Sequence, residues 1–378
     1  MSMDDIPAMH ILRTYGFHGG ERQLCQLFEA AKQGFREVFV CVYKDRECEA
    51  RYRKIEHLAL EKLWPGAVPP RDNLWIEFFC LLALLPILHT ALLFQIIKHR
   101  PRVCVVHGFQ AAVVAWPMAW LFRDIGFAYC HRSTKGRWGR SRVFKILYKP
   151  FRCLVAISDS VAESLRATTT REDIVLIMNG VDWQGLREQA QPLERDLRAP
   201  FVLTMVGRLT PDKEHELVMR SLRSLRHEVA NAELWIAGTG EHEQELRTVS
   251  KEMGLEQAVR FLGYRKDVVN VLQASDVFVH ASKSEGLSNG VLEAMAMGLP
   301  SVVVAAPGVS ECHEVGHTAF VVDRDAEALA ARLLQLARDP QLRRRMGEKA
   351  FERVKTQFSI EANRAGYASL YRSLAGVV

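Results

Sequence analysis

The sequence lacks the features that mark several classes of protein. Its eight cysteines include no Cys-x-x-Cys pair and lie mostly in apolar runs, so we expect free, buried thiols in a reducing compartment rather than a disulfide framework or a metal site. It has no low-complexity tract and no repeat of the length, about 20–50 residues, that builds solenoids. The first residues, MSMDDIPAMHIL, contain no basic segment followed by an apolar stretch, and we therefore expect a cytoplasmic protein.

The composition is that of an ordinary globular protein, with 378 residues, 48% of them apolar and 25% charged. This length exceeds what one hydrophobic core usually serves, so two domains of roughly 150–200 residues are expected. The formal net charge is +6, and the basic excess lies in the first half of the chain, up to about residue 190. An acidic partner is therefore expected to prefer the first half.

One segment, residues 78–97, carries no charge over twenty residues, a length that could span a bilayer. Pro86, His89, Thr90 and Gln95 weaken that interpretation. The strand-like segments before and after it are also expected in one sheet, on the same side of any membrane. We therefore interpret it as a buried or groove-lining pair of helices, with contact to a membrane surface and a true span as the alternatives.

Short apolar runs alternate with amphipathic stretches along the whole chain, and we interpret them as strands and helices. Such alternation implies parallel sheets covered on both faces. Two sets predict an α/β protein with two Rossmann-like domains, at 1–185 and 186–358, and a closing helix within 359–378. The polar segment 183–199 is expected to be the linker. Helices are expected at 20–33, 74–98, 111–122, 142–150, 159–167, 214–227, 241–253, 266–274, 290–297, 325–338 and 360–374.

Ligands of such sheets bind beyond the carboxyl ends of the strands, so the loops there carry the candidate sites. Gly19-Gly20 follows the first strand, where it forms either a simple turn or an approach to a helix N-terminus for an anion. A later strand is followed by Arg208, and Thr210 is expected to cap the next helix. Lys213 in that first turn opposes the helix dipole unless an anion lies between them.

The strongest local feature is the segment EGLSNGVLE, in which Glu285 and Glu293 are separated by seven residues. Small residues between them can present backbone N–H groups at the start of a helix. Carboxylates at both ends accept hydrogen bonds from hydroxyls, while the helix N-terminus holds a phosphate. Alternatively, Glu285 caps the helix and Glu293 lies on its solvated face.

This segment resembles the Glu-x7-Glu motif of the retaining glycosyltransferases of family 4, which have the GT-B fold of two Rossmann-like domains facing a central cleft. The resemblance extends in the same order over nearly the whole chain, through GGERQL, VVHGF, AYCHRS, LVAISDSVAESL, VLIMNGVD, MVGRLTPDKEHEL, LWIAGTGEHEQEL, VRFLGYRKDV, EAMAMGLPSVV and FSIEANRAGYASLYRSL. GGERQL departs from the family in one respect: it lacks the residue, often Ala, between Gly and Glu.

The resemblance implies that the N-terminal domain binds the acceptor and the C-terminal domain binds a nucleotide-diphosphate sugar, UDP- or GDP-linked. Arg208 and Lys213 would bind the donor diphosphate, Glu285 the sugar hydroxyls and Glu293 the ribose hydroxyls. The sugar and phosphates would also contact the backbone N–H groups of Gly286, Leu287, Ser288, Asn289 and Gly290.

Three further positions follow from the same resemblance. The Tyr264-Arg265 loop would lie at the nucleobase of the donor, and Gly19-Gly20 would approach the phosphates or the acceptor. His131 would face the reacting sugar, unless it is a core histidine. We expect front-face displacement, in which Arg208 and Lys213 take the place of a divalent metal and no cofactor is needed.

Asp323-x-Asp325 resembles a metal-binding Asp-x-Asp pair, but its place at a helix start favours capping.

The segment 132–152 contains eight basic and no acidic residues, interleaved with aromatic and aliphatic side chains. It is a solvated basic face, a nucleic-acid contact or a contact with an anionic membrane. No nucleic-acid module accompanies it, so together with 78–97 it favours peripheral attachment to the inner face of the membrane and a saccharide or lipid-linked acceptor, as in polysaccharide or lipopolysaccharide synthesis. The rival functions are a non-catalytic nucleotide-sugar-binding protein, a sugar-nucleotide epimerase and a phosphorylase.

Overall fold

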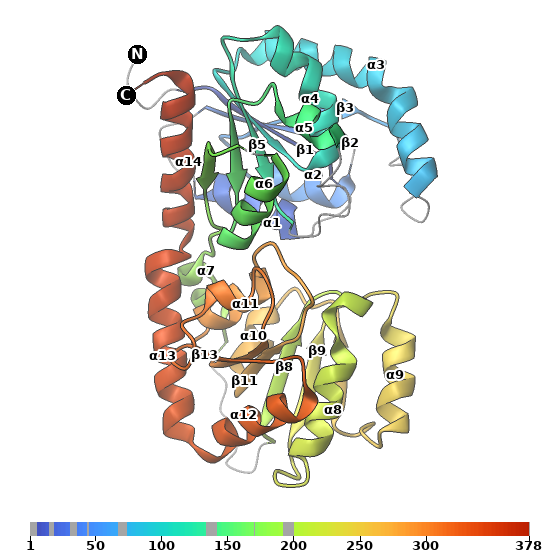
Figure 1. Ribbon diagram of the computed structural model, residues 1–378, viewed down its shortest axis with the longest axis vertical. Coiled ribbons are helices and arrows are strands. Elements are labelled where there is room, and N and C mark those ends of the chain that lie inside the picture. Colours follow the sequence, from blue (N-terminus) through green and yellow to red (C-terminus); the bar gives the residue numbers. More distant parts are fainter. Residues whose placement is uncertain are drawn as a thin grey trace. The chain divides into compact units, whose positions relative to one another are not determined.

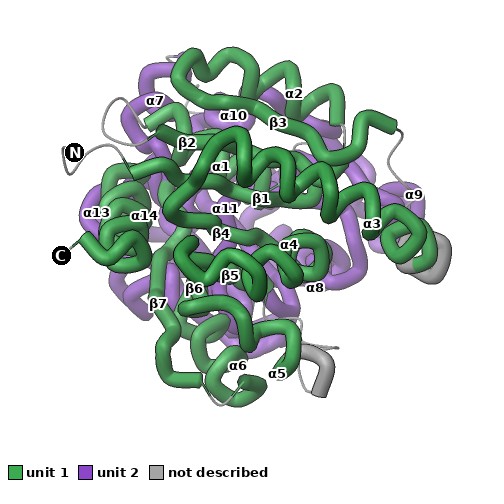
Figure 2. The backbone as a smooth tube through the Cα atoms, turned by 90° about the horizontal axis from the view of Figure 1, so that it is seen from above, with its two compact units in different colours: residues 1–180, 360–378 green, residues 181–359 purple. Residues whose placement is uncertain are grey.

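The computed structural model describes residues 6–14, 19–30, 36–43, 45–66, 74–133, 142–169, 171–191 and 200–377. Two compact units make up the chain (Figure 2), unit 1 with residues 1–180 and 360–378 and unit 2 with residues 181–359. The sequence placed the corresponding joins at 185/186 and 358/359. Each unit is an α/β layered structure around a parallel sheet, which confirms the predicted fold class.

Unit 1 contains a seven-stranded sheet in the order β3-β2-β1-β4-β5-β6-β7, with every neighbouring pair parallel. Its first six strands along the sheet follow the order 3-2-1-4-5-6 of doubly wound folds, whose switch point lies between the first and fourth strands. The central strands are buried on both faces, which is why they read as continuous apolar runs. The strands are β1 (Ala8–Leu12), β2 (Glu37–Tyr43), β3 (Ala59–Trp64), β4 (Val103–His107), β5 (Gly126–His131), β6 (Cys153–Ala156) and β7 (Ile174–Leu176).

The helices of unit 1 mostly match the expected ranges to within a few residues. They are α1 (Gly19–Glu29), α2 (Arg46–Tyr52), α3 (Leu74–His99), α4 (Phe109–Leu121), α5 (Arg142–Tyr148), α6 (Asp159–Thr169) and α14 (Ile360–Ala375). The sequence reading missed α2, which Asp45 caps by accepting from the Cys48 N–H at 2.9 Å, and the edge strand β3 that follows it.

The uncharged segment 78–97 lies in one continuous helix, α3, so the expected pair of helices is wrong. Within α3, the hydroxyl of Thr90 donates to the backbone carbonyl of Pro86, one turn earlier in the helix, at 3.1 Å. The helix is long and apolar enough to cross a membrane. However, it connects β3 and β4, which belong to the same sheet. Both its ends therefore lie on one side of any membrane, and α3 does not span it.

The closing helix α14 returns to unit 1, where it packs against α1, β4 and β5. Its Arg364 forms an ion pair of 2.7 Å with Glu37, whose side chain is completely buried at the start of β2. Asn363 donates to the carbonyl of Met178, and Gly366 lies against Ile177. These contacts hold α14 against unit 1, and the ribbon of Figure 1 shows the course of this helix.

Unit 2 contains a six-stranded parallel sheet in the order β10-β9-β8-β11-β12-β13, again the doubly wound order with its switch point between β8 and β11. The strands are β8 (Val202–Val206), β9 (Glu233–Ala237), β10 (Val259–Gly263), β11 (Val277–His280), β12 (Ser301–Val304) and β13 (Ala319–Val322). The helices are α7 (Trp183–Gln189), η1 (Pro211–Lys213), α8 (His215–Leu225), α9 (Glu243–Glu252), α10 (Val268–Gln273), α11 (Asn289–Ala296), η2 (Ser310–Cys312), α12 (Ala326–Arg338) and α13 (Pro340–Gln357).

Two helices of unit 2, α7 and α13, were not predicted. Helix α7 lies within the expected linker 183–199, where Asp182 caps it and Trp183 packs edge-on against Phe351 of α13. Residues 192–199 lie outside the described residues.

Two expectations from the sequence are confirmed in the described structure. Asp325 accepts from the Ala328 N–H at 2.8 Å, which confirms that it caps α12. All eight cysteines are free, and seven of them are buried, as predicted.

Candidate active site

The loop after β8 begins with a close approach between two backbones. A Cβ on Gly238, at the end of β9, would lie 1.7 Å from the carbonyl oxygen of Gly207, at the end of β8. Both glycines have positive φ angles that side chains rarely adopt. Arg208 follows this contact and is exposed at the carboxyl edge of the sheet, without an ion pair to any other described residue.

The turn after Arg208 differs from the predicted helix start. Thr210 does not cap a helix; its hydroxyl bonds to Asp212 at 2.7 Å, and residues 211–213 form a separate 3-10 turn. Glu214 then adopts a left-handed conformation, and α8 begins only at His215. Lys213 therefore lies before the helix rather than in its first turn.

Lys213 and Glu285 meet at the switch point between β8 and β11. The ammonium of Lys213 forms an ion pair with Oε1 of Glu285 and donates to the Ser282 hydroxyl at 3.3 Å. Nε2 of His280, the last residue of β11, lies 3.2 Å from the same Oε1. Because the two loops follow adjacent strands, residues 72 positions apart in the chain come into contact.

Glu285 is ionised over the whole physiological range of pH. Burial alone would raise its pKa, but the hydrogen bond from His280 and the positive charge of Lys213 outweigh burial and lower the pKa to about 2. Glu285 thus remains a pure hydrogen-bond acceptor, and the charge of Lys213 is balanced by a carboxylate that itself lies at a ligand-binding edge.

Helix α11 begins directly beyond this pair. Gly290 brings its first turn against β8, since a Cβ there would lie 3.0 Å from the carbonyl oxygen of Val206. Its N-cap residue, Ser288, makes no side-chain capping bond. Gly308, with φ +71, packs beneath the backbone of Glu285 and Gly286, so the loop rests on a close contact as well as on the ion pair.

The structure contradicts the alternative interpretation of the paired glutamates, in which Glu285 caps the helix and Glu293 is solvated. Glu293 is buried in α11, so the alternative that it lies on a solvated face is wrong. Glu285 makes side-chain bonds to Lys213 and His280, and the N-cap of α11 is Ser288. The intervening Leu287 and Ser288 are buried, while Gly286 and Asn289 are half-buried.

Tyr264 and Arg265 follow β10, two strands from β8 on the same edge of the sheet. Tyr264 is 51% exposed, and Arg265 forms an exposed ion pair of 2.6 Å with Asp267. They and Arg208 therefore face solvent at the carboxyl edge, whereas Lys213, Glu285 and the start of α11 form the organised centre.

The remaining predicted residues belong to unit 1. Gly19 and Gly20 open α1, and a Cβ on Gly20 would come no closer than 3.9 Å, to the Arg132 side chain. His131 ends β5, is half-buried, and lies 3.2 Å from the hydroxyl of Tyr129. Burial lowers its pKa to about 4, against a smaller opposing effect of its bond to the backbone of Ser133, so the ring is neutral at pH 7.

Sequence reasoning missed two groups of residues around the site. His280 and Ser282 hold the Glu285–Lys213 pair, and a histidine that ends a strand just before an acidic loop was a signal for them. Glu214 was missed too; it forms ion pairs with Lys283 at 3.3 Å and with Arg324, and so fixes the turn that carries Lys213.

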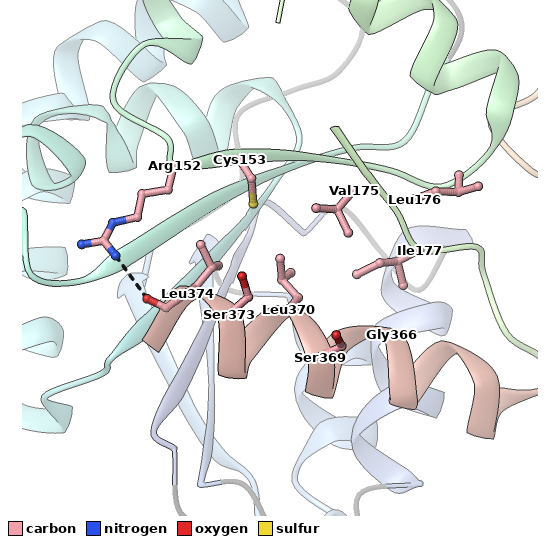
Figure 3. Close-up of a pocket in the computed structure, with 10 residues that line it drawn as sticks. All are labelled: Arg152, Cys153, Val175, Leu176, Ile177, Gly366, Ser369, Leu370, Ser373 and Leu374. Carbon is pink, nitrogen blue, oxygen red and sulfur yellow. Dashed lines mark hydrogen bonds between the residues drawn. The ribbon is translucent and has the colours of Figure 1, made fainter. Parts of the chain in front are cut away.

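A pocket in unit 1 lies between α14, β6 and the edge strand β7 (Figure 3). Arg152 lies at its rim and donates to the carbonyl of Leu374 at 3.2 Å. No residue predicted for the donor lines this pocket, so it belongs to the packing of the closing helix. Within the part of the chain that the structure describes, no three His, Cys, Asp or Glu side chains are grouped to hold a metal ion.

Comparisons with known proteins agree for both units. Residues 17–184 match the family described as Glycosyltransferase Family 4, and residues 187–353 match Glycosyl transferases group 1. The lipopolysaccharide core biosynthesis glycosyltransferase LpsD of Rhizobium meliloti is 30% identical over 71% of this chain and 77% of its own length. LpsE of the same organism is 31% identical over 58% of this chain and 64% of its own length.

Solved structures share the fold at low sequence identity. HepE from Anabaena, in complex with UDP, has a TM-score of 0.77 and 18% identity, covering 97% of this chain and 100% of that one. Sucrose-phosphate synthase from Thermosynechococcus elongatus has a TM-score of 0.79 and 20% identity, covering 99% and 100%. The two doubly wound units are those of a GT-B glycosyltransferase. The chain belongs to the family 4 glycosyltransferases of group 1.

Proposed function

We propose that the protein is a retaining glycosyltransferase that moves a sugar from a UDP- or GDP-linked donor to a saccharide or lipid-linked acceptor in cell-surface polysaccharide or lipopolysaccharide synthesis. The observation that carries the proposal is the Lys213–Glu285–His280 cluster at the start of α11, on the switch point of unit 2. The named relatives support the pathway: LpsD and LpsE act in lipopolysaccharide core biosynthesis, and another relative is a galactosyltransferase for a GlcNAc-diphosphoundecaprenol acceptor.

In this proposal unit 2 binds the donor. Lys213 and the exposed Arg208 take the diphosphate, because both cations lie at the carboxyl edge beside the N-terminus of α11. Glu285, held ionised, accepts from hydroxyls of the donor sugar, and Glu293 accepts from the ribose hydroxyls. Tyr264-Arg265 contacts the base. The backbone N–H groups that contact the sugar and phosphates are those of Gly286, Leu287, Ser288, Asn289 and Gly290.

The transfer itself is proposed to occur on one face of the sugar. The bond between the anomeric carbon and the diphosphate oxygen breaks, and its electron pair stays on that oxygen, where Lys213 and Arg208 stabilise the charge. The leaving oxygen accepts the proton of the acceptor hydroxyl as the new bond forms from the same side. His131 is neutral and is proposed to face the reacting sugar, with Gly19-Gly20 beside the phosphates or the acceptor. The lysine and arginine charges act where other enzymes use a divalent metal.

Exchanging the two central side chains tests the site. We expect Glu285→Gln and Lys213→Ala each to lower kcat/KM by at least about 100-fold, because each removes a charged contact to the donor in a preorganised site. Lys251→Ala is the matched control: it removes an exposed cation of α9 in the same unit and is expected to stay within about threefold of the unchanged enzyme. Thermal melting checks that all three variants fold. Near-normal turnover of both Glu285→Gln and Lys213→Ala contradicts the site assignment.

The anomeric configuration of the product tests the mechanism and separates the rival functions. UDP-, GDP- and ADP-sugars are first screened for binding by calorimetry, and the donor that binds is then used in a transfer reaction followed by proton NMR. We expect the new bond to have the donor's anomeric configuration. An inverted product contradicts front-face transfer. A donor that binds without any transfer favours the non-catalytic binding protein, and conversion of the donor sugar alone favours the epimerase.

We further propose that unit 1 attaches to the inner face of the cytoplasmic membrane through α3. Over the part of α3 whose side chains the structure describes, residues 79–99, the large apolar side chains that are exposed lie on one side of the helix, opposite its buried side: Phe79, Leu82, Ile87, Phe94 and Ile97. Phe79 and Phe94 are each 62% exposed. Patches of this kind mark contact surfaces, and a lipid surface suits an apolar face that carries no charged residue from Phe79 to Ile97.

Cationic residues of segment 132–152 would add attraction to anionic lipids. Lys145 and Lys149 are exposed near Ile146, whereas Arg152 is bound to the backbone carbonyls of Arg123 and Leu374. Lys135, Arg137 and Arg140 lie outside the described residues, as does the side chain of Arg142.

Co-sedimentation with vesicles tests this attachment. We expect the unchanged protein to bind vesicles that contain about one third anionic lipid, and the double variant Phe79→Asp, Phe94→Asp to bind at least about tenfold more weakly, because two large apolar side chains no longer enter the lipid. Val315→Asp, which changes an equally exposed residue of unit 2, is expected to bind normally. Equal binding of all three proteins contradicts a membrane contact through α3.

A further inference from the structure

A line of buried polar side chains crosses unit 1 from the closing helix to the end of β5. The hydroxyl of Tyr371 in α14 donates to Glu37 Oε1 at 3.2 Å and lies 2.5 Å from His10 Nε2. His10 Nδ1 lies 2.9 Å from His107 Nε2. On the far side of His107, Nδ1 lies 3.4 and 3.3 Å from Nε and Nη2 of Arg132. Glu37, Tyr371, His10 and His107 are essentially inaccessible to solvent.

Arg132 fixes the direction of every bond in this line. A guanidinium has no acceptor, so His107 Nδ1 must accept, and the proton of the neutral ring lies on Nε2. That proton is donated to His10 Nδ1, which places the proton of His10 on Nε2, where it is donated to Tyr371. The Tyr371 hydroxyl then donates to the Glu37 carboxylate. The line is thus consistent with one set of tautomers, in which both rings are neutral.

The pKa values of the two rings agree with that arrangement. Burial, with smaller effects of the Arg364 and Arg132 charges, lowers the pKa of His10 to about 3. Burial and the charge of Arg132 also hold the pKa of His107 well below its ordinary value. Protonation of either ring would place a donor against a donor and break the line.

No described carboxylate forms an ion pair with Arg132. It is half-buried, its guanidinium donates to the neutral His107 and interacts with the side chains of Cys130 and Tyr367, and the charge of Glu21 acts on it from beyond ion-pair distance. A positive charge removed from water without a carboxylate in direct contact is costly. The line from Glu37 nevertheless holds Arg132 there, which favours a ligand-binding role for this position.

The place of Arg132 in the fold points to the same conclusion. His107 ends β4 and Gly20 follows β1, and these two strands flank the switch point of unit 1, where doubly wound sheets bind their ligands. The Arg132 side chain reaches this point from the end of β5, since it bonds to His107 and lies 3.9 Å from a Cβ built on Gly20. Unlike the exposed Lys145 and Lys149, Arg132 is therefore not part of a solvated basic surface.

We propose that Arg132 binds a phosphate group of the acceptor, and that His107, His10 and Tyr371 are positioning residues that orient its guanidinium. The inference rests on the proposed function, because it assigns the acceptor to unit 1. A guanidinium provides several N–H donors in one plane, and those not directed at His107 match the oxygens of a phosphate. The enzyme then selects acceptors that carry phosphate near the hydroxyl to be glycosylated.

The test combines a change in the enzyme with a change in the acceptor. A lipopolysaccharide core oligosaccharide is used with and without its phosphate groups, with the donor held at saturation. We expect the unchanged enzyme to lose at least about tenfold in kcat/KM when the phosphates are removed. Arg132→Ala is expected to be equally slow with both acceptors and to keep its KM for the donor. Lys149→Ala, which removes an exposed charge of the same segment, is expected to keep the preference for phosphate.

Tyr371→Phe tests the positioning role, because it removes the hydroxyl that connects His10 to Glu37 and leaves the guanidinium in place. We expect KM for the phosphorylated acceptor to rise severalfold with kcat nearly unchanged, and the preference for phosphate to weaken; a purely structural role would change neither. Arg132→Lys, which keeps the charge, is expected to regain part of the preference lost in Arg132→Ala.

Two results overturn the inference while the proposed function stands: an Arg132→Ala enzyme that keeps the normal preference for the phosphorylated acceptor, or an unchanged enzyme that does not distinguish the two acceptors. Failure of the unchanged enzyme to glycosylate either oligosaccharide contradicts the proposed lipopolysaccharide acceptor, and the inference fails with it. Melting curves of each variant show that the protein compared is folded.

Discussion

The ion pair between Lys213 and Glu285 is the contact on which the organisation of the proposed donor site depends. It joins the loop after β8 to the loop after β11, and His280 and Ser282 hold its two members from the strand side. Because the pair is largely removed from water, loss of one partner would leave a charge unbalanced. The same pair can exchange partners when a ligand binds: the diphosphate would pair with Lys213, and sugar hydroxyls would donate to Glu285. The backbone need not move for this exchange, because the Gly207–Gly238 and Gly308–Glu285 contacts fix it.

Unit 1 uses a related principle with a different outcome. There the buried carboxylate of Glu37 is paired with Arg364, which fastens the closing helix to the sheet. The hydrogen-bonded line that begins at Glu37 ends at Arg132, with which no described carboxylate forms an ion pair. Both units thus place a cation at the switch point of a parallel sheet. In unit 2 a carboxylate from the neighbouring loop pairs with the cation, whereas in unit 1 the cation donates to the neutral ring of His107 and has no carboxylate in direct contact. We therefore propose that the two positions recognise the donor and the acceptor phosphates.

Much of the fold could be predicted from the sequence, because each strand that is buried on both faces appears as a short apolar run between two helical segments. The elements that were missed have polar or mixed sequences: β3 is an edge strand that contains Glu61 and Lys62, and α7 and α13 are rich in charge, so neither period nor hydrophobicity marked them. Segment 78–97 was expected to form a pair of helices, whereas it continues through Pro86 as one helix, α3. For the site, local sequence identified Glu285 and Lys213, but the αL conformation of Glu214 and the role of His280 depend on contacts between different strands, which no local pattern contains.

Hydrogen–deuterium exchange of the full-length protein with and without saturating UDP or GDP tests the central claim, that unit 2 holds the donor nucleotide around the Lys213–Glu285 pair. We predict that the nucleotide slows exchange of the backbone amides in two segments, 207–213 and 284–293, because phosphate oxygens accept from the N–H groups at the start of α11 and the bound nucleotide makes local opening of the turn after β8 less frequent. Protection confined to unit 1, with both segments of unit 2 unchanged by a nucleotide that binds, would contradict the account.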